Sequence, residues 1–513
     1  MNWLRFGKNV PKSIIAGGGL LSLSGAALAE LELASPFSDR AVLQREQAVA
    51  IWGKAESGSE VTVSFAGQME TTLVNEQGKW EVKLAPMEAS SIGRVLTVRD
   101  SSDTIVEIED VVVGEVWICA GQSNMKMEVS RVPEVKAIAR KVDNVRTYVI
   151  PQMVAMTEQD RMEGSWESQP PSSAVACAFA HFLQEETEVP VGVIQAAWGS
   201  SSLEAWMPRA MTEVSPHFKI MMEEFDTDTE TLERIESILS GKRPWSTKDD
   251  IFLRRQSNIL YNAMIHPLIP YSCRGLVWYQ GERNAQSIQG MVDEPWFGRH
   301  SGMLRYGQTL QRWIECYRQR WNNESMHFMV VMLPGYYKPL STGPRGGATE
   351  PATHSWAWMR ESQLMALELP HTSIVNTIDL GDVKNIHPRD KLPIGKRLAL
   401  AALRDVLGEE IVAQGPIVKE VVVQDSKLMV SWTGGEGLRT VDGKAPSGFW
   451  IADNSSKWVE AQAKLEGETV ILSSDRVSKP LYARYAFSGK PNVNLVNGVG
   501  LPAYPFRTDD FKP

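Results

Sequence analysis

Four groups of polar residues, each placed after an apolar run of the sequence, could together carry out nucleophilic chemistry. The groups are Gly121-Gln122-Ser123, Trp198-Gly199-Ser200-Ser201, Gln280-Gly281-Glu282-Arg283-Asn284 and Asn385-Ile386-His387. A serine hydroxyl becomes a nucleophile when a base, most often histidine, takes its proton, and hydrogen-bond donors must then hold the oxyanion that forms. Acyl transfer at Ser123 is therefore one chemistry that the pattern allows. The alternative for Ser123 taken alone is a helix N-cap, a position that serine favours.

The elements that must position these groups lie between residues 111 and 410. Apolar runs predict strands at 111–120, 189–196, 275–280, 327–333 and 372–378, and mixed patterns predict helices near 174–186, 303–320 and 357–367. This alternation predicts a doubly wound, mostly parallel sheet of the α/β class. Because chemistry in such sheets lies at the carboxyl ends of the strands, the four groups should converge.

The regions on either side of this part have a different texture. Residues 30–110 and 415–513 both contain short β-type runs separated by turn residues, and each region is expected to form a β-sandwich. The charged stretch 226–250 is expected to be a helical insertion on the surface, where its charges are solvated. The predicted domains are thus 30–110, 111–410 and 415–513, without an internal repeat.

Residues 1–29 have the composition of an export signal. A basic head containing Arg5, Lys8 and Lys12 precedes an apolar, small-residue run, and Ala27-Leu28-Ala29 matches an A-x-A cleavage site. The mature protein is expected to begin near Glu30 and to be periplasmic or secreted, with no later stretch able to span a membrane. The formal net charge of −9 becomes more negative without this segment, which argues against nucleic acid or an anionic membrane as a partner.

The cysteines and histidines narrow the chemistry further. Cys119, Cys177, Cys273 and Cys316 have no C-x-x-C spacing, so no zinc site is indicated, and one disulfide remains open. Among the eight histidines, His387 is the one that follows a strand together with other polar groups. His387 is therefore the candidate base.

The motifs also resemble those of a known family. The blocks Gly121-Gln122-Ser123-Asn124-Met125, Trp278-Tyr279-Gln280-Gly281-Glu282 with Asn284, and Ile386-His387-Pro388-Arg389-Asp390-Lys391 are similar to the signature blocks of the sialate O-acetylesterase-like carbohydrate esterases, a branch of the SGNH hydrolases. The stretches 39–45, 260–265, 360–363 and 500–507 also look like that family, so the resemblance covers nearly the whole mature chain. It implies a flavodoxin-like SGNH domain flanked by two β-sandwich regions.

The resemblance also implies a mechanism. Ser123 would be the nucleophile and His387 the base, and the oxyanion would be held by the backbone N–H groups of Ser123 and Gly199 and by the side chain of Gln280. The reaction would release acetyl groups from sugar hydroxyls through an acetyl-enzyme, without metal or cofactor.

Two positions depart from the family pattern. SGNH enzymes commonly carry an aspartate three residues before the histidine, and relatives in this branch often have one two residues before it, but Lys384 and Asn385 stand at these positions. Possible supporting or acid residues are Glu282, Asn284, Asp379, Asp382 and Asn385, and a Ser-His dyad oriented by a backbone carbonyl is an alternative. In addition, the second glycine that is common after Trp-Gly is replaced by Ser200.

Several questions stay open at this level. The substrate could be O-acetylated sialic acid or an acetylated hemicellulose such as xyloglucan or xylan, and Arg283 is the nearest cation for a sialic acid carboxylate. A non-catalytic carbohydrate-binding protein on a degenerate esterase scaffold is the alternative function, which the missing aspartate keeps open. An α/β-hydrolase is disfavoured because the block around Ser123 lacks the second glycine of G-x-S-x-G. The oligomeric state cannot be read from the sequence.

Overall fold

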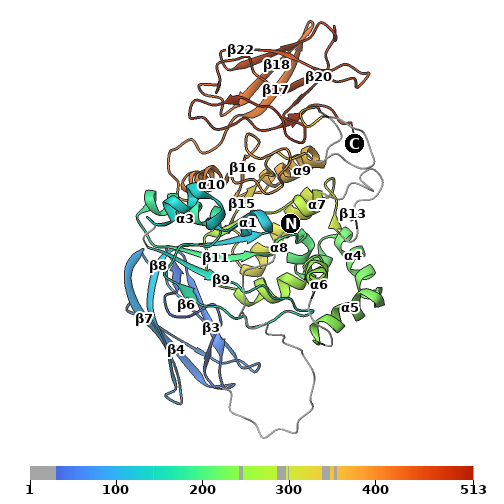
Figure 1. Cartoon of the computed structure of the whole chain (residues 1–513). Helices are drawn as coiled ribbons and strands as arrows, with labels where there is room; N and C mark the ends of the chain where they lie inside the picture. Colours follow the sequence, from blue (N-terminus) through green and yellow to red (C-terminus); the bar gives the residue numbers. More distant parts are fainter. Residues whose placement is uncertain are drawn as a thin grey trace.

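The structure is a computed structural model that describes residues 30–141, 144–241, 246–285, 296–297, 300–337, 347–351 and 355–511. The expected export signal, residues 1–29, lies outside these described residues. Figure 1 shows three parts along the molecule: sheets of the N-terminal residues at one end, a central α/β part, and sheets of the C-terminal residues at the other end.

A mixed sheet in the central part carries the candidate site. Its described strands follow the order β10-β9-β11-β8-β12-β15-β16, and all neighbours are parallel except β9 and β10. Their bounds are β8 Ile105–Gly121, β9 Val145–Val149, β10 Trp166–Glu167, β11 Val191–Ala197, β12 Gly275–Tyr279, β15 His327–Val331 and β16 Thr372–Val375. Every residue of β11, β12 and β15 is buried, which explains why these strands appear in the sequence as continuous apolar runs.

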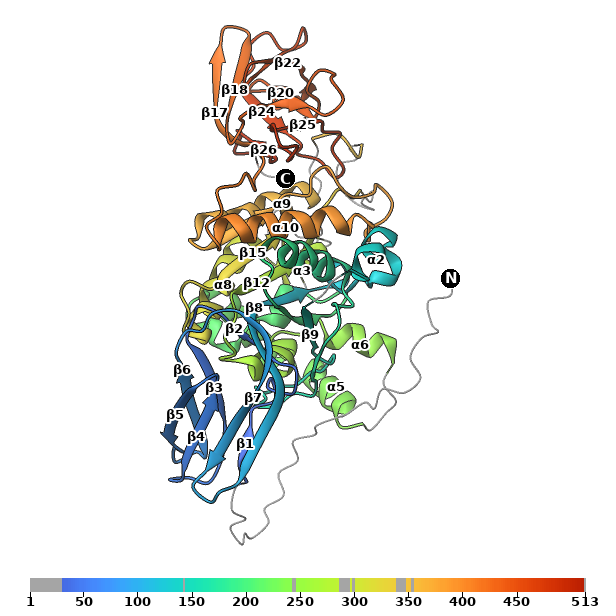
Figure 2. The ribbon, with the colours of Figure 1, turned by 90° about the vertical axis from the view of Figure 1, so that its left-hand side faces the viewer.

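Helices connect these strands, as the alternating pattern predicts. The described α-helices are α1 Ser123–Lys126, α2 Pro133–Ala139, α3 Ala174–Thr187, α4 Pro216–Thr227, α5 Thr229–Leu239, α6 Thr247–Leu253, α7 Glu282–Ala285, α8 Tyr306–Trp321, α9 Ser355–Leu364 and α10 Lys391–Asp405. Helices α3 and α10 pack against each other, and α8 packs against α9. Figure 2 shows α3 and α10 lying together along one side of the central strands. The predicted helical insertion at 226–250 corresponds mainly to α5 and α6.

Strand β8 connects the central sheet with the N-terminal sheets. Its first half pairs with β7 (Ser90–Asp100), and its second half pairs with β11 and β12. The boundary expected between residues 110 and 111 therefore falls inside one continuous strand. The buried carboxylate of Glu115 lies in this strand and binds Arg45 and Arg274 at 2.6 and 2.7 Å, which ties the N-terminal region to the start of β12.

Most of the remaining described N-terminal strands pair in antiparallel fashion. One sheet contains β1 Glu32–Leu33, β3 Val49–Lys54 and β6 Lys79–Leu84; β4 Glu60–Phe65, β5 Gln68–Leu73, β7 and the first half of β8 form the other, and β2 Val42–Gln44 is the exception, because it pairs with β8 in parallel. In β4 and β6 every second residue is buried, so one face of each strand packs on the core and the other faces solvent.

The C-terminal strands form two four-stranded sheets. Their bounds are β17 Ile417–Gln424, β18 Lys427–Thr433, β23 Thr469–Ser473 and β22 Gln462–Glu466 in one sheet, and β21 Val459–Glu460, β20 Phe449–Ala452, β24 Tyr482–Tyr485 and β26 Phe506–Arg507 in the other, with β19 Arg439–Thr440 pairing β25 Leu495–Val496. Trp432 of the first sheet contacts three rings of the second, with centroids 6.4 Å from Phe449, 5.8 Å from Tyr485 and 5.7 Å from Phe506. These rings form the core between the two sheets.

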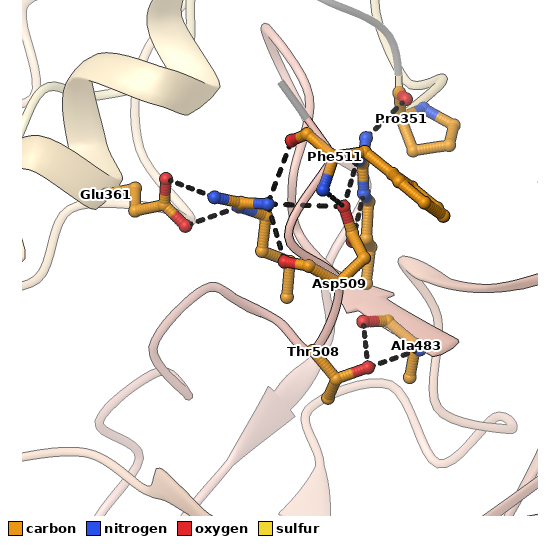
Figure 3. Close-up of polar contacts among 8 residues, drawn as sticks. Pro351, Glu361, Ala483, Thr508, Asp509 and Phe511 are labelled. Atoms are coloured by element: carbon orange, nitrogen blue, oxygen red, sulfur yellow. Dashed lines mark hydrogen bonds and ion pairs between the residues drawn. The ribbon is translucent and has the colours of Figure 1, made fainter. Parts of the chain in front are cut away.

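The last strand is joined to the central part by charged groups. Arg507 binds Glu361 of α9 and also the buried carboxylate of Asp509 (Figure 3). Asp509 in turn forms a two-point ion pair with Arg484 at 2.8 and 2.7 Å. Thr508 exchanges hydrogen bonds with the backbone of Ala483, so residues 507–509 are fixed both to β24 and to α9.

A buried arginine supplies a second link between α9 and the C-terminal residues. Arg360 is fully buried, and its guanidinium donates to the carbonyl oxygens of Leu333, Pro334, Ser488 and Gly489. No carboxylate among the described residues pairs with it, and burial lowers its pKa to about 9. The Arg360 side chain thus donates hydrogen bonds to four buried backbone carbonyl oxygens.

We expect Arg360→Met to lower the free energy of unfolding by at least about 3 kcal/mol, because several buried carbonyl groups would lose their donor at once. Urea denaturation followed by tryptophan fluorescence measures the change. Arg476→Met, at an exposed arginine between C-terminal strands, is the matched control and should leave the midpoint unchanged. Equal midpoints for the two variants would contradict this prediction.

The four cysteines are buried free thiols, so the disulfide that the sequence left open does not form. Among the described residues, no helix is long and apolar enough to cross a membrane.

Candidate active site

Ser123 lies at a sharp turn where three strands of the central sheet end. Gly121 has φ +144°, and a Cβ at this position would lie 2.2 Å from the carbonyl oxygen of Tyr279, so only glycine fits. The backbone N–H of Gln122 donates to the same oxygen at 3.1 Å, and the N–H of Trp198 donates to the carbonyl of Gly121 at 3.0 Å. These bonds tie the ends of β8, β11 and β12 together and place Ser123 at the first residue of α1.

Gly199 brings a second backbone segment against Ser123. A Cβ on Gly199 would lie only 3.3 Å from the Cβ of Ser123, so the absent side chain allows the close approach. Ser200 follows with φ +63°, a region that favours glycine. Its hydroxyl accepts a hydrogen bond of 2.7 Å from Nη2 of Arg255, which holds the turn in this conformation.

His387 reaches Ser123 from the loop between β16 and α10. The Nε2 atom of the imidazole lies 2.8 Å from Oγ of Ser123. Burial, followed by the positive charges of Lys391 and Arg131, lowers the pKa of His387. The neutral imidazole, which is the form able to accept a proton, is therefore favoured.

None of the candidate acids contacts the imidazole of His387 in the part of the chain that the structure describes. Asp382 accepts hydrogen bonds from the backbone N–H groups of residues 384 and 385, Asp379 forms a two-point ion pair with Arg397, and Glu282 accepts from the side chain of Asn124. Asn385 accepts a hydrogen bond of 3.0 Å from the backbone N–H of His387. This loop therefore holds the backbone of His387, while no carboxylate among the described residues contacts its ring.

Gln280 and Asn284 are buried behind the turn that contains Gly199. The side-chain amide of Gln280 donates to the carbonyl of Ser201 at 3.1 Å and to Oδ1 of Asn284 at 2.8 Å, and its oxygen accepts from Tyr306. Asn284 donates to Glu204 and to the carbonyl of Ser301. Both amide hydrogens of Gln280 are thus used inside the protein, so this side chain is not free to donate to an oxyanion in this conformation.

Two residues that the sequence argument gave no role lie beside the Ser123–His387 pair. Asn124 donates to Glu282 and to the carbonyl of Ile386, and it accepts from Nζ of Lys391 at 2.8 Å. Asn124 and Lys391 are these two residues. Both belong to the motifs quoted above, but nothing in their residue types indicates a role in the chemistry. Their contacts span more than 260 positions of the chain, a separation that pattern analysis does not bridge.

Two guanidinium groups near the turn form no ion pair among the described residues. Burial lowers the pKa of Arg283, and the charge of buried Glu204 partly offsets this effect. Arg255 donates to Ser200, and the buried Nε of Arg283 has no hydrogen-bond partner in the part of the chain that the structure describes. Burial and then the charge of Arg283, followed by that of Arg254, lower the pKa of Arg255 to about 10, which still leaves it cationic at neutral pH. Arg254, by contrast, pairs with Asp250 at 3.3 Å.

The arrangement combines a hydroxyl, a neutral imidazole and closely approaching backbone, which are the parts that acyl transfer requires. No group of histidine, cysteine, aspartate or glutamate side chains among the described residues is arranged to hold a metal ion.

Comparison with known proteins gives a consistent result. A crystal structure of a carbohydrate acetylesterase from Xanthomonas citri superposes with a TM-score of 0.77 at 30% identity, covering 94% of this chain and 100% of that protein. Sialate O-acetylesterase from Rattus norvegicus is 26% identical over 92% of this chain and 93% of its own length, and the protein of that name from Homo sapiens is 24% identical over 89% and 88%. No family model matches the chain.

Proposed function

Because the chain belongs to the sialate O-acetylesterase-like carbohydrate esterases, and is thus a carboxylic ester hydrolase, we propose that it removes acetyl groups from sugar hydroxyls with Ser123 as nucleophile. The observation that carries the proposal is the 2.8 Å contact between Oγ of Ser123 and Nε2 of His387 at the ends of the parallel strands. The SGNH type of domain is part of this proposal, and the parallel order of the central strands supports it.

In the first half of the reaction, Nε2 of His387 takes the proton of Ser123 as Oγ attacks the acetyl carbonyl carbon. The carbonyl oxygen becomes an oxyanion, to which the backbone N–H groups of Ser123 and Gly199 donate. Collapse of this intermediate breaks the bond to the sugar oxygen, and the imidazolium returns the proton to that oxygen. The products are the free sugar hydroxyl and acetyl-Ser123.

In the second half, a water molecule gives a proton to His387 and attacks the acetyl carbon. Cleavage of the bond to Oγ releases acetate, and the imidazolium reprotonates Ser123. The lowered pKa of His387 suits both steps, because the imidazole must be neutral before each attack.

Gln280 is proposed as a third donor to the oxyanion, under one condition. One of its two amide hydrogens, now directed to Ser201 and Asn284, must be released when the substrate binds. Without that exchange, Gln280 acts by holding the turn that carries Gly199.

We propose a Ser-His dyad in place of a complete triad. Asp382 and Asn385 support the dyad by fixing the backbone of the loop before His387. Asn284 supports the dyad indirectly, because it accepts a hydrogen bond from the side chain of Gln280 and so holds that side chain in place. Glu282 also supports the dyad indirectly, because it accepts a hydrogen bond from the side chain of Asn124, the residue after Ser123. An orienting acid also stabilises the imidazolium, so its absence lowers the rate but keeps the mechanism.

For the substrate, we favour an acidic acetylated sugar, such as O-acetylated sialic acid, over a neutral hemicellulose. Neither Arg283 nor Arg255 forms an ion pair among the described residues, although the charge of buried Glu204 acts on Arg283. A guanidinium is well suited to bind a carboxylate. A neutral xyloglucan or xylan chain would not use these charges. The experiment is acetate release from 9-O-acetylated sialic acid and from acetylated xyloglucan oligosaccharide, with Ser123→Ala as the blank.

We expect Arg283→Gln to lower kcat/KM for 9-O-acetylated sialic acid by roughly 10–100-fold, the effect of one charge-assisted hydrogen bond. Turnover of a neutral aryl acetate should change by less than about threefold, because that substrate has no carboxylate. Arg254→Gln is the matched control, since this neighbouring arginine is already paired with Asp250. Equal losses on both substrates, or a wild-type preference for the xyloglucan oligosaccharide, would rule out an acidic-sugar site.

We further propose that the protein is exported and acts in the periplasm or outside the cell, with cleavage after Ala29. Amino-terminal sequencing of the mature protein should start at Glu30.

A further inference from the structure

The side chain of Asn124 is fully buried and makes three hydrogen bonds. Its amide nitrogen donates to Oε1 of Glu282 and to the carbonyl oxygen of Ile386, the latter at 3.0 Å. Its amide oxygen accepts from Nζ of Lys391 at 2.8 Å. Both hydrogens of the amide are therefore used, and the residue can neither rotate nor flip without losing a bond.

These bonds connect the nucleophile with the base. Asn124 directly follows Ser123 in the chain, and Ile386 directly precedes His387. The backbone of the histidine is thus held through the carbonyl before it by Asn124 and through its own N–H by Asn385. With both sides of the histidine fixed, few positions of the imidazole relative to Ser123 remain.

Lys391 and Glu282 determine which way the amide of Asn124 points. The ammonium group of Lys391 can only donate, so it selects the amide oxygen, while the carboxylate of Glu282 selects the nitrogen. Both are buried, and the ammonium of Lys391 also lies 5.1 Å from the centre of the Tyr279 ring. Burial lowers the pKa of Lys391 to about 7, against the raising effect of the charges of Glu282 and Asp390.

A buried set of charges contributes little net stability compared with apolar packing, so stability alone does not account for this network. One acceptor, Oε2 of Glu282, is buried without a hydrogen-bond partner among the described residues, which is a cost that well-packed cores avoid. The network joins α1, α7 and the start of α10 at the one place where the two reacting side chains meet.

We propose that Asn124, oriented by Lys391 and Glu282, is the positioning residue that aligns His387 with Ser123. It takes over the alignment part of the role that an acid has in a triad, acting through the backbone of the base rather than through the imidazole ring. The inference rests on the proposed function, because it takes Ser123 and His387 as the reacting pair.

The direct test is Asn124→Asp. The new side chain has almost the same shape but replaces the two donors by an acceptor, so the bonds to Ile386 and Glu282 are lost while the bond from Lys391 can remain. We expect kcat on an aryl acetate to fall by about 10²-fold, the effect of a small misplacement of a catalytic group, with KM changed by less than about twofold.

Asn376→Asp is the matched control. Asn376 is also buried, donates to two carbonyl oxygens, those of Pro502 and Ala503, and accepts from the backbone N–H of Ile378. Its substitution should lower the melting temperature by a similar amount but leave kcat unchanged below that temperature. Equal kcat losses in the two variants would overturn the proposal, because they would show a general effect on folding.

Lys391→Met supplies a second, independent readout. At a pH where His387 is fully neutral, kcat/KM should fall by about tenfold or more, because the amide of Asn124 is no longer held. The acid limb of the pH profile should also move to higher pH, because one of the two cations that face His387 is removed and Arg131 remains. The shifted limb reports only the loss of the Lys391 charge beside His387, whereas the fall in kcat/KM reports the alignment. Wild-type kcat/KM in Lys391→Met would therefore overturn the proposal even if Asn124→Asp does not fold.

The experiment separates this inference from the proposed function. If Ser123→Ala retains turnover, the proposed function fails and the inference fails with it. If Ser123→Ala is inactive while Asn124→Asp keeps the wild-type kcat, only the positioning role is refuted.

Discussion

Ser123→Ala should lower the turnover of an aryl acetate by about 10⁴-fold or more, leaving only the catalysis that binding and the oxyanion donors supply. The variant removes the single oxygen that would form the acetyl-enzyme, while the turn itself is set by Gly121 and by backbone bonds that alanine keeps. The fold and the affinity for the sugar product should therefore remain. The assay is acetate release at saturating substrate, with melting temperature recorded for both proteins.

The control is Ser130→Ala, at an exposed serine on the same segment, which should behave as wild type. Rapid acid quenching of the wild type during turnover should yield one acetyl group on the peptide that contains Ser123. Equal rates for Ser123→Ala and the wild type would instead support the reading of a binding protein on a degenerate scaffold.

The sequence predicts the central strands well because burial on both faces leaves a clear signal. Strands β11, β12 and β15 are uninterrupted apolar runs, and the predicted helices near 174–186 and 303–320 correspond to α3 and α8. The same argument misses β9, whose five residues include Arg146 and Thr147. A short strand near the edge of a sheet lacks the apolar run on which such a prediction depends.

The junction between the first two regions was less predictable. The sequence places a boundary after residue 110, where β-type texture gives way to an apolar run, yet β8 continues through it from Ile105 to Gly121. The first six residues of β8 mix polar and apolar types and only Ile108 among them is buried, whereas every residue from Val111 to Gly121 is buried and nearly all are apolar. A change of burial along one strand therefore resembles the end of a domain.

The candidate site was predictable in its groups but not in its connections. Ser123, Gly199 and His387 follow strand ends, and the geometry of a parallel sheet brings such residues together. The contacts of Asn124 with Ile386 and Lys391 join residues far apart in sequence, and no local rule relates them. The same holds for Arg255, which reaches Ser200 from a helix end 55 positions away.

Removal of the imidazole should have an effect close to that of removing the hydroxyl. We expect His387→Gln to lower kcat/KM at neutral pH by roughly 10³–10⁴-fold or more, because no carboxylate among the described residues lies in contact with Ser123 and could take its proton. The matched control is His181→Gln, at a largely buried histidine of α3 that lies 3.8 Å from Glu185, and it should retain full activity.

The pH profile identifies His387 as the base more sharply than the loss of rate does. In the wild type, burial and the charges of Lys391 and Arg131 lower the pKa of His387, so the neutral base persists below the usual value of about 6.5. The kcat/KM should therefore fall only as the pH drops through this lowered pKa. In His387→Gln that acid limb should vanish, and the residual rate should rise with hydroxide concentration. A limb that survives at the same pH in His387→Gln would assign the proton transfer to another group and refute the Ser-His dyad.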